Sequence, residues 1–297
     1  MKQICITAFT LLVLLSCGKQ TRAPASKGEK ERTGLFPVKL GGKYGYIDKT
    51  GKLVINPQFD QAEDFSEGLA QVELGRKCGY IDKTGRYVIN PQFDSAWCFS
   101  EGLAPVRLGG KWGYIDKTGK YVINPQFDWA GSFSEGLAQV ELGRKHGYID
   151  KTGKYAINPQ FDCAGDFSEG LAQVGLGIEW GYIDKTGKYV INPQFGCAGD
   201  FSEGLAPVEL GRRHGYIDKT GKYVINPQFD WAWSFSEGLA QVELGGKYGY
   251  IDRTGRYAVN PQFDYAENFS EGLAQVELGG KHGYIDKTGK YVWEPSE

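Results

Sequence analysis

The sequence lacks several features that mark familiar classes of protein. It has one methionine but 43 glycines and 18 tyrosines among 297 residues, a composition typical of short strands and tight turns rather than of helices. No segment after residue 16 is apolar enough to span a membrane as a helix, which takes about 20 residues. No Cys-x-x-Cys or other regular zinc spacing occurs. Lysine plus arginine (34) nearly balance aspartate plus glutamate (36). The basic residues are isolated, so nucleic-acid binding has no electrostatic support.

The first sixteen residues have the pattern of an export signal. Lys2 is the only charge before an apolar run over residues 4–15, which fits the apolar core of a signal peptide and is too short for a bilayer. The run ends in Leu14-Leu15-Ser16-Cys17, which resembles a bacterial lipobox. That resemblance implies cleavage after residue 16, a lipid on Cys17 and a place in the bacterial cell envelope, anchored to a membrane. The alternatives are an ordinary Cys17, or cleavage at Ala23-Pro24-Ala25 in a secreted protein.

Residues 17–34 are expected to form a tether between the lipid and the rest of the chain. Residues 18–34 are mostly polar and charged, and such a composition buries too little apolar surface to fold. A flexible chain of this length has a typical reach of roughly 20–25 Å. The prediction is a signal peptide over 1–16, a lipid-anchored tether over 17–34 and a folded domain over 35–297.

The predicted folded domain consists of eight tandem repeats with a period of 34 residues. In the unit that starts at Leu103, residues 103–108 and 112–116 predict two strands. Asp116-Lys117-Thr118-Gly119 predicts the hairpin turn after them. Residues 121–123 predict a third strand, which Pro125 is expected to end because proline cannot donate to a ladder. The connector after it could form one helical turn. The Gly-Tyr-Ile-Asp motif of each unit begins at Gly45, Gly79, Gly113, Gly147, Gly181, Gly215, Gly249 and Gly283.

These motifs resemble the bacterial WG (KWG) repeat family. The resemblance rests on Lys111-Trp112-Gly113-Tyr114-Ile115-Asp116, Asn124-Pro125-Gln126-Phe127, Ser134-Glu135-Gly136-Leu137-Ala138 and their equivalents over residues 35–293. It implies an all-β interaction module with no shared catalytic residues. The chain departs from the family at the tryptophan itself, which only two of the eight units retain, so this column is not an essential site. The column reads Tyr44, Cys78, Trp112, His146, Trp180, His214, Tyr248 and His282.

The repeats predict one continuous body. A single unit has too few apolar residues to fold alone, so neighbouring units must stack. Eight three-stranded units predict an all-β, propeller-like closed body, because propellers typically have four to eight blades. The terminal units also lack the polar caps that an open array should need. An open β-solenoid is the alternative.

Few residues suggest chemistry. Asp48, Glu67 and their equivalents recur in nearly every unit, which indicates scaffold roles, since a catalytic acid needs one special environment. His146, His214 and His282 share a column with Cys78 and are metal-ligand types, so a metal-assisted enzyme is an alternative. The preferred prediction has no catalytic residue, no metal and no cofactor. Cys163 and Cys197 occupy equivalent positions and could form a disulfide only if their Cα atoms lie within about 7 Å; the alternative, slightly favoured, is two small apolar residues without a disulfide.

Two connector columns vary between units that are otherwise nearly identical. Repeat proteins typically bind through variable positions on one surface, so the large aromatic residues of these columns are the predicted binding residues. We expect a non-enzymatic lipoprotein that binds an envelope protein or a glycan. The alternatives are a structural envelope protein without a dedicated ligand, in which these aromatic residues pack on the body, and the enzyme above. The predicted binding residues are Trp97, Trp129, Trp231, Trp233 and Tyr265.

Overall fold

The computed structural model describes residues 34–296. The predicted signal peptide, the lipid site Cys17 and the predicted tether up to residue 33 lie outside the described residues. Among residues 34–296 there is no helix long and apolar enough to cross a bilayer.

The described chain is all-β, and its 31 strands form eight antiparallel sheets that follow one another in sequence order. The first sheet has three strands, β1 (Leu35–Leu40), β2 (Lys43–Asp48) and β3 (Leu53–Phe59). The next three sheets are β4 (Gln61–Ser66), β5 (Leu69–Leu74), β6 (Lys77–Ile81), β7 (Tyr87–Phe93); β8 (Ser95–Ala96), β9 (Leu103–Leu108), β10 (Lys111–Asp116), β11 (Tyr121–Phe127); and β12 (Trp129–Ala130), β13 (Leu137–Leu142), β14 (Lys145–Asp150), β15 (Tyr155–Phe161).

The four remaining sheets repeat the same order. They are β16 (Cys163–Ala164), β17 (Leu171–Leu176), β18 (Glu179–Asp184), β19 (Tyr189–Phe195); β20 (Cys197–Ala198), β21 (Ala206–Leu210), β22 (Arg213–Ile217), β23 (Tyr223–Phe229); β24 (Trp231–Ala232), β25 (Leu239–Leu244), β26 (Lys247–Asp252), β27 (Tyr257–Phe263); and β28 (Tyr265–Ala266), β29 (Leu273–Leu278), β30 (Lys281–Asp286), β31 (Tyr291–Ser296).

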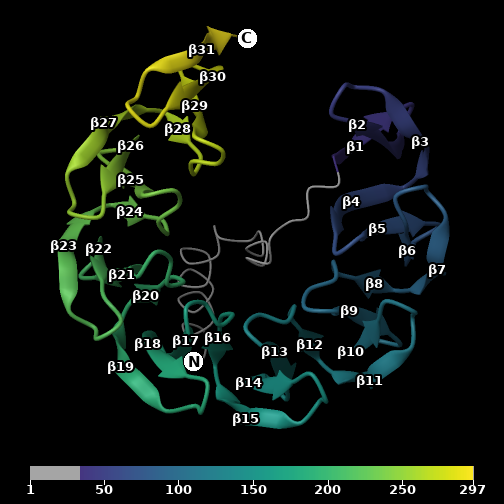
Figure 1. The fold of residues 1–297 in the computed structure, drawn as a ribbon. Helices are drawn as coiled ribbons and strands as arrows, with labels where there is room; N and C mark the ends of the chain where they lie inside the picture. The colour runs from purple at the N-terminus through teal and green to yellow at the C-terminus, as the bar shows by residue number, and fades with distance from the viewer. Residues whose placement is uncertain (1–33, 297) are drawn as a thin grey trace, which may run out of the picture.

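Seven of the eight sheets have a fourth strand that the sequence did not predict. The connector forms no helical turn; its first residues form a short strand, such as β12, that pairs with the next long strand, β13. Figure 1 shows that this short strand is the innermost of its sheet and that the strand ending in Asn-Pro-Gln-Phe is the outermost. Each connector therefore fastens one sheet to the next.

The eight sheets lie on an open arc. Figure 1 shows an opening between the last sheet (β28–β31) and the first (β1–β3), and no sheet of the described residues includes strands from both ends. The predicted closed, propeller-like body is therefore wrong, and the open alternative holds. The physical reason is local: at every internal junction a connector supplies the inner strand of the next sheet, whereas β1 has no such strand within residues 34–296.

The outer strand continues through its proline, contrary to the sequence prediction. β11 runs from Tyr121 to Phe127, with a bulge in its pairing to β10 between Trp112 and Tyr114. Proline is tolerated here because an edge strand at a bulge needs no ladder donor. The bulge presses the backbone against Gly113, where a Cβ would lie 2.5 Å from the carbonyl oxygen of Ile123 and 2.6 Å from the nitrogen of Pro125. The same approach recurs at the Gly-Tyr-Ile-Asp glycines of the first seven units and explains why they are glycine.

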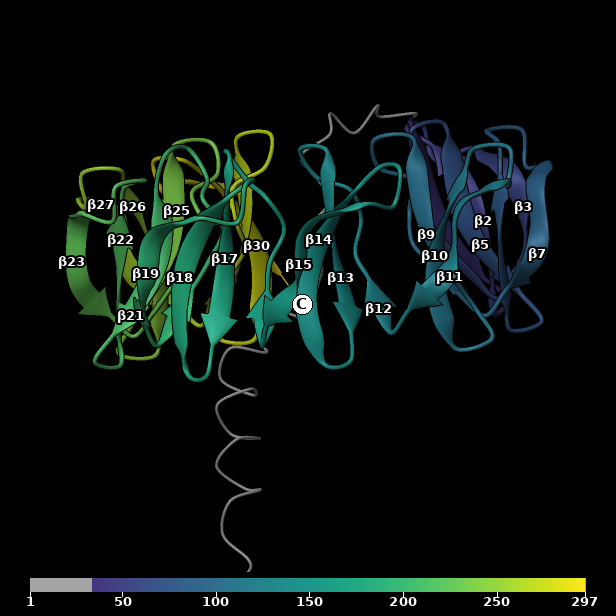
Figure 2. The same cartoon turned by 90° about the horizontal axis from the view of Figure 1, so that it is seen from below.

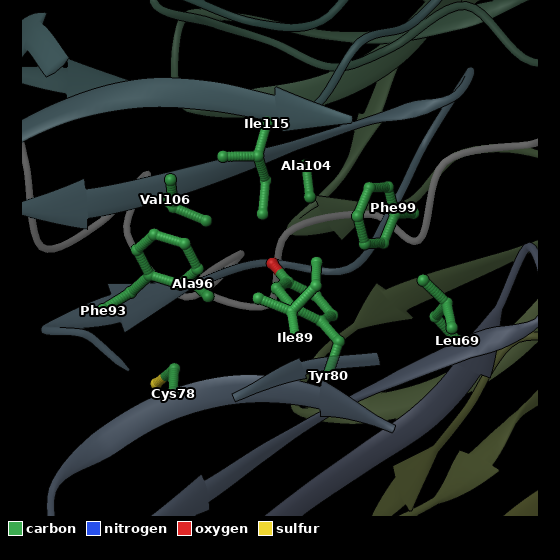
Figure 3. Packing of buried hydrophobic residues seen from close by; sticks show 10 residues of the cluster. All are labelled: Leu69, Cys78, Tyr80, Ile89, Phe93, Ala96, Phe99, Ala104, Val106 and Ile115. Atoms are coloured by element: carbon green, nitrogen blue, oxygen red, sulfur yellow. The ribbon is translucent and has the colours of Figure 1, made fainter. Parts of the chain in front are cut away.

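The hydrophobic core lies between successive sheets rather than within one. Figure 3 shows Tyr80 and Ile89 of the second sheet facing Ala104, Val106 and Ile115 of the third sheet, with Phe99 of the connector at one end. The same arrangement recurs at the other junctions. Each sheet is therefore stabilised mainly by its two neighbours, as in other repeat arrays.

Candidate functional site

The two ends of the strands form two different faces of the arc, seen edge-on in Figure 2. In the fourth sheet, Leu137 pairs with Asp150 at one end of β13 and β14, and Leu142 pairs with Lys145 at the other. We call the end with the Asp-Lys-Thr-Gly turns and the Ser-Glu-Gly loops the hairpin face. We call the end with the turn between Leu142 and Lys145, and its equivalents, the variable face.

The hairpin face is nearly the same from unit to unit, and its carboxylates accept hydrogen bonds within the fold. Asp150 Oδ1 accepts hydrogen bonds from the hydroxyl and amide of Thr152, at 2.6 and 2.9 Å, and from the amide of Lys154 at 3.1 Å. These bonds lower the pKa of Asp150 because they favour the ionised form. The bond from the Thr152 hydroxyl has the largest effect. Glu135 accepts from the amide of Gly170 at 3.0 Å and pairs with Lys185 at 3.1 Å. These carboxylates act as scaffold.

The variable face has the first variable column of the connector and the family's tryptophan column, and rings of the second variable column pack on the latter, as Trp97 does on Trp112. Trp129 pairs with Glu141, and Glu141 pairs with His146, in the row directly before the turn between Leu142 and Lys145. Directly paired residues of antiparallel strands project to the same side. The first variable column and the tryptophan column therefore share one end of every sheet that has a connector strand, which is the geometry expected of a binding surface in a repeat protein.

Trp97 is the most exposed of the predicted tryptophans. Its side chain is 43% exposed and lies parallel to the buried Trp112, with ring centroids 6.2 Å apart and an interplanar angle of 15°. The guanidinium of Arg107 lies over the Trp112 ring at 5.9 Å, a cation–π contact that helps to fix the stack. Trp97 is thus a rigid aromatic surface open to solvent on one side.

A second aromatic group lies over the sixth to eighth sheets. Trp231 stacks on His214 at 5.0 Å, Trp233 lies 5.7 Å from Tyr248, and Tyr265 meets Tyr248 edge-on at 5.8 Å. Tyr265 is 44% exposed, whereas the two tryptophans are half-buried. The structure therefore brings Trp233 and Tyr265 together on Tyr248, and it places Trp231 on His214 of the preceding sheet.

Trp129 stands apart from both groups. It is half-buried, and its ring covers Gly131 so closely that a Cβ there would lie 2.9 Å from the ring. The Trp129 ring therefore packs on its own connector with one part and is exposed to solvent with the other.

Comparison with known proteins identifies the repeat. A family model described as "WG containing repeat" matches residues 44–78, 79–112, 112–145, 147–177, 180–212, 215–248 and 248–281. The chain belongs to the WG-repeat family. This confirms the resemblance seen in the sequence. The comparison with curated proteins finds no match.

Solved structures resemble this WG-repeat protein only distantly. A eukaryotic initiation factor is 11% identical, with 89% of this chain and 96% of that chain covered and a TM-score of 0.49. Hsv2p of Kluyveromyces lactis is 7% identical, with 80% and 97% covered and a TM-score of 0.48. PorZ, a bacterial surface component of the type-IX secretion system of Porphyromonas gingivalis, is 8% identical, with 81% of this chain but 38% of that chain covered and a TM-score of 0.40. All three TM-scores are below 0.5.

The histidine column of the WG-repeat protein does not converge on a metal position. No group of three or more His, Cys, Asp or Glu residues within residues 34–296 could hold an ion. His146 and His214 lie in different sheets, where Gln139 Nε2 contacts His146 Nδ1 at 2.7 Å and the Asp230 carbonyl contacts His214 Nδ1 at 2.9 Å. Burial lowers the pKa of both histidines. Cys163 and Cys197 form no disulfide in the described chain.

Sequence reasoning missed one pair of carboxylates, Asp166 and Asp200. Burial, and then the charge of Asp200, raise the pKa of Asp166 to about 6. The signal was in the sequence, since this connector column has Asp in these two successive units and Ser in the units on either side (Ser132, Asp166, Asp200 and Ser234). Burial and the like charge of the neighbouring carboxylate make ionisation of Asp166 unfavourable in the folded protein. We therefore interpret the pair as destabilising at neutral pH.

Replacing Asp166 with asparagine is expected to stabilise the protein at pH 7. The folded pKa of Asp166 lies above its ordinary value, so between about pH 4 and 6 the folded state binds more protons and stability falls as the pH rises. The Asp166→Asn variant has no carboxylate to ionise, so its free energy of unfolding should exceed that of the wild type by about 1–2 kcal/mol at pH 7.5. At pH 4 the difference should be small. Urea unfolding at both pH values measures the difference.

Asp162→Asn is the matched control in the same connector. Lys145 bonds to Asp162 and, with the amide of Gly177, lowers its pKa, so its loss should be unfavourable at pH 7.5. If Asp166→Asn and Asp162→Asn change stability in the same direction at pH 7.5, the Asp166 prediction is wrong.

Proposed function

We propose that this WG-repeat protein is a non-enzymatic binding module, anchored by lipid at the bacterial cell envelope, that holds an envelope protein or a glycan at its variable face. The observation that carries the proposal is the contrast between the two faces. The hairpin face has the same turns and the same lysine–glutamate ion pairs in successive units. The variable face has the residues that differ, including the exposed rings of Trp97 and Tyr265.

The position of the first described strand, β1, supports this proposal. Leu35 pairs with Asp48, so β1 begins on the hairpin face. A lipid on Cys17 followed by a tether would therefore attach the arc from its hairpin side. The variable face would then point away from the membrane, toward partners.

The chemistry of the variable face suits recognition better than catalysis. Trp, Tyr and Arg are the residues enriched among energetic hot spots of interfaces, and Trp97, Trp112 and Arg107 are held as a stack. A stacked ring loses little conformational entropy when a partner covers it.

A structural envelope protein without a dedicated ligand is the second candidate. It is favoured by the burial of Trp129, Trp231 and Trp233, which are each half-buried and pack on their own or the preceding sheet. In that case these aromatic residues stabilise the junctions and have no partner outside the molecule.

Affinity capture from envelope extract distinguishes the two candidates. The wild-type bait is compared with a double variant, Trp97→Ala with Tyr265→Ala, which truncates the two most exposed predicted residues. A control bait carries Val122→Ala with Val224→Ala, because these valines are similarly exposed, at 44% and 46%, but lie on outer strands. We expect a partner that the wild type and control retain and that the double variant loses by at least about tenfold.

Two results would count against a binding role for the variable face. One is a partner that the double variant retains as well as the wild type does. The other is a wild-type bait that enriches neither a protein nor a glycan, which would favour the structural candidate.

A further inference from the structure

Each internal junction holds the following connector by the same contacts. At the seventh sheet, Lys247 pairs with Asp264 at 2.5 Å, and the Tyr250 hydroxyl donates to the carbonyl of Glu267 at 2.6 Å. The Tyr250 ring lies 4.7 Å from that of Phe269 at an angle of 60°. The connector is thus bound at its aspartate, at a backbone carbonyl and at its phenylalanine.

A serine of the preceding connector completes the set. The hydroxyl of Ser236 donates to the carbonyl of Phe269 at 2.9 Å. The tyrosine hydroxyl bond and the Tyr–Phe contact recur at all seven junctions. The ion pair recurs at six junctions. Repetition shows that these groups together form a receptor for a connector.

The last sheet has the same groups, but no connector covers them. Tyr284 is 39% exposed, whereas its seven equivalents are at most 1% exposed, and its hydroxyl reaches only Gln275 Oε1, at 3.5 Å. Lys281 is exposed and makes no ion pair with any described residue. Ser270 is likewise exposed, and its hydroxyl has no acceptor within residues 34–296. Figure 1 places β30 and β31 at the opening of the arc.

The same face has an aromatic residue that internal sheets lack. Trp293 occupies the position of Ile89 and Ile123, is 50% exposed and lies 6.1 Å from the Tyr284 ring. A second exposed ring beside the tyrosine enlarges the apolar surface on which an incoming phenyl ring could pack.

We propose that the open face of the last sheet binds an extended segment of another protein with the form Asp-x-Ala-x-x-Phe. The aspartate pairs with Lys281, the backbone accepts from Tyr284 and Ser270, and the phenylalanine packs on Tyr284 and Trp293. Alanine follows the aspartate by two residues in every connector that has this aspartate. This interface would have the same contacts as those between a connector and a sheet at the internal junctions, but the partner protein would contribute the segment.

Neither residues 1–33 nor the seven described connectors offer such a segment to the last sheet. The seven connectors among the described residues are each held at their own junction. Residues 1–33 contain no aspartate. The partner is therefore recognised by an acidic residue and an aromatic residue five positions apart on an extended chain, a form of recognition that uses both main-chain and side-chain contacts.

A labelled peptide with the sequence of residues 58–69 tests the proposal by fluorescence anisotropy on the full-length protein. The wild-type peptide should bind saturably. The Phe65→Ala peptide should bind at least about tenfold more weakly, because the phenyl burial is lost. Lys281→Glu in the protein should weaken wild-type binding about two- to fivefold, as expected for an exposed ion pair.

A charge exchange and a matched variant make the test specific. The Asp60→Lys peptide should bind Lys281→Glu better than it binds the wild-type protein. Lys290→Glu, in the hairpin turn of the same unit, should leave binding unchanged. Circular dichroism confirms that each variant is folded. The proposal is overturned by the absence of saturable binding, by equal binding of the Phe65→Ala peptide, or by binding that Lys281→Glu leaves unchanged.

Discussion

Gly181→Ala is expected to destabilise the protein by more than about 4 kcal/mol or to prevent folding. A Cβ at Gly181 would lie 2.5 Å from the carbonyl oxygen of Ile191, 2.6 Å from the nitrogen of Pro193 and 2.8 Å from the carbonyl carbon of Asn192. All three are backbone atoms of the bulged outer strand, so no side-chain rotation relieves the clash. The strands would have to separate, with loss of ladder hydrogen bonds and of core packing on both sides. Urea unfolding followed by circular dichroism measures the loss.

Gly175→Ala is the matched control for this prediction. Gly175 is also a strand glycine, but a Cβ there would meet only the Cβ of Cys163, at 3.3 Å, and the Trp180 ring, at 3.5 Å. Most other units have a glutamate or an arginine at this position. Gly175→Ala should therefore be neutral or stabilise by about 0.5–1 kcal/mol, because glycine is unfavourable within a strand. Comparable losses in the two variants would show that the bulge is not the cause.

Tyr182→Ala is expected to cost about 3–5 kcal/mol. The Tyr182 side chain is fully buried, its hydroxyl donates to the carbonyl of Gly199 at 2.8 Å, and its ring lies 4.9 Å from that of Phe201. Truncation removes a large apolar side chain from the junction between the fifth and sixth sheets. It also leaves a connector carbonyl without its donor.

The same change at the open end should cost much less. Tyr284 holds the equivalent position but is 39% exposed and packs on no following connector, so Tyr284→Ala should cost about 1 kcal/mol or less. Tyr182→Phe, which removes only the hydroxyl, should cost about 1–2 kcal/mol. Thermal and urea unfolding of the three variants give the comparison. If Tyr284→Ala is as costly as Tyr182→Ala, the last sheet is covered in solution and the arc does not end there.

The sequence predicted the parts of the fold that depend on neighbouring residues. Alternation gave the strands around Tyr114, and Asp116-Lys117-Thr118-Gly119 gave the hairpin turn, because both are local. The bulge was missed because proline was taken to end a strand, whereas an edge strand accommodates it. The inner strand was missed because two residues such as Trp129 and Ala130 have no periodicity. The opening of the arc was missed because the inner strand that each connector supplies was not predicted, so the lack of such a strand beside β1 within residues 34–296 could not be recognised.

The candidate site was predicted in the same partial way. Comparison of the units identified the variable columns without a structure. It did not predict that Trp233 and Tyr265 both contact Tyr248, or that Trp97 stacks on Trp112, because these contacts join different strands. The special place of Tyr284 and Lys281 could not be seen either, since the same residue types are buried or ion-paired in the other units.

The open arc also changes how the protein comes apart. A closed ring has no first sheet to lose, so it must break an internal junction before anything unravels. Here the outermost sheets have one neighbour each, and Phe36, Tyr284 and Trp293 are already solvated on one side. Under heat or mechanical load the array should peel from its two ends inward, unit by unit, since each sheet relies on its neighbours. The middle sheets should then unfold last, and a partner that binds an end sheet should stabilise the whole array.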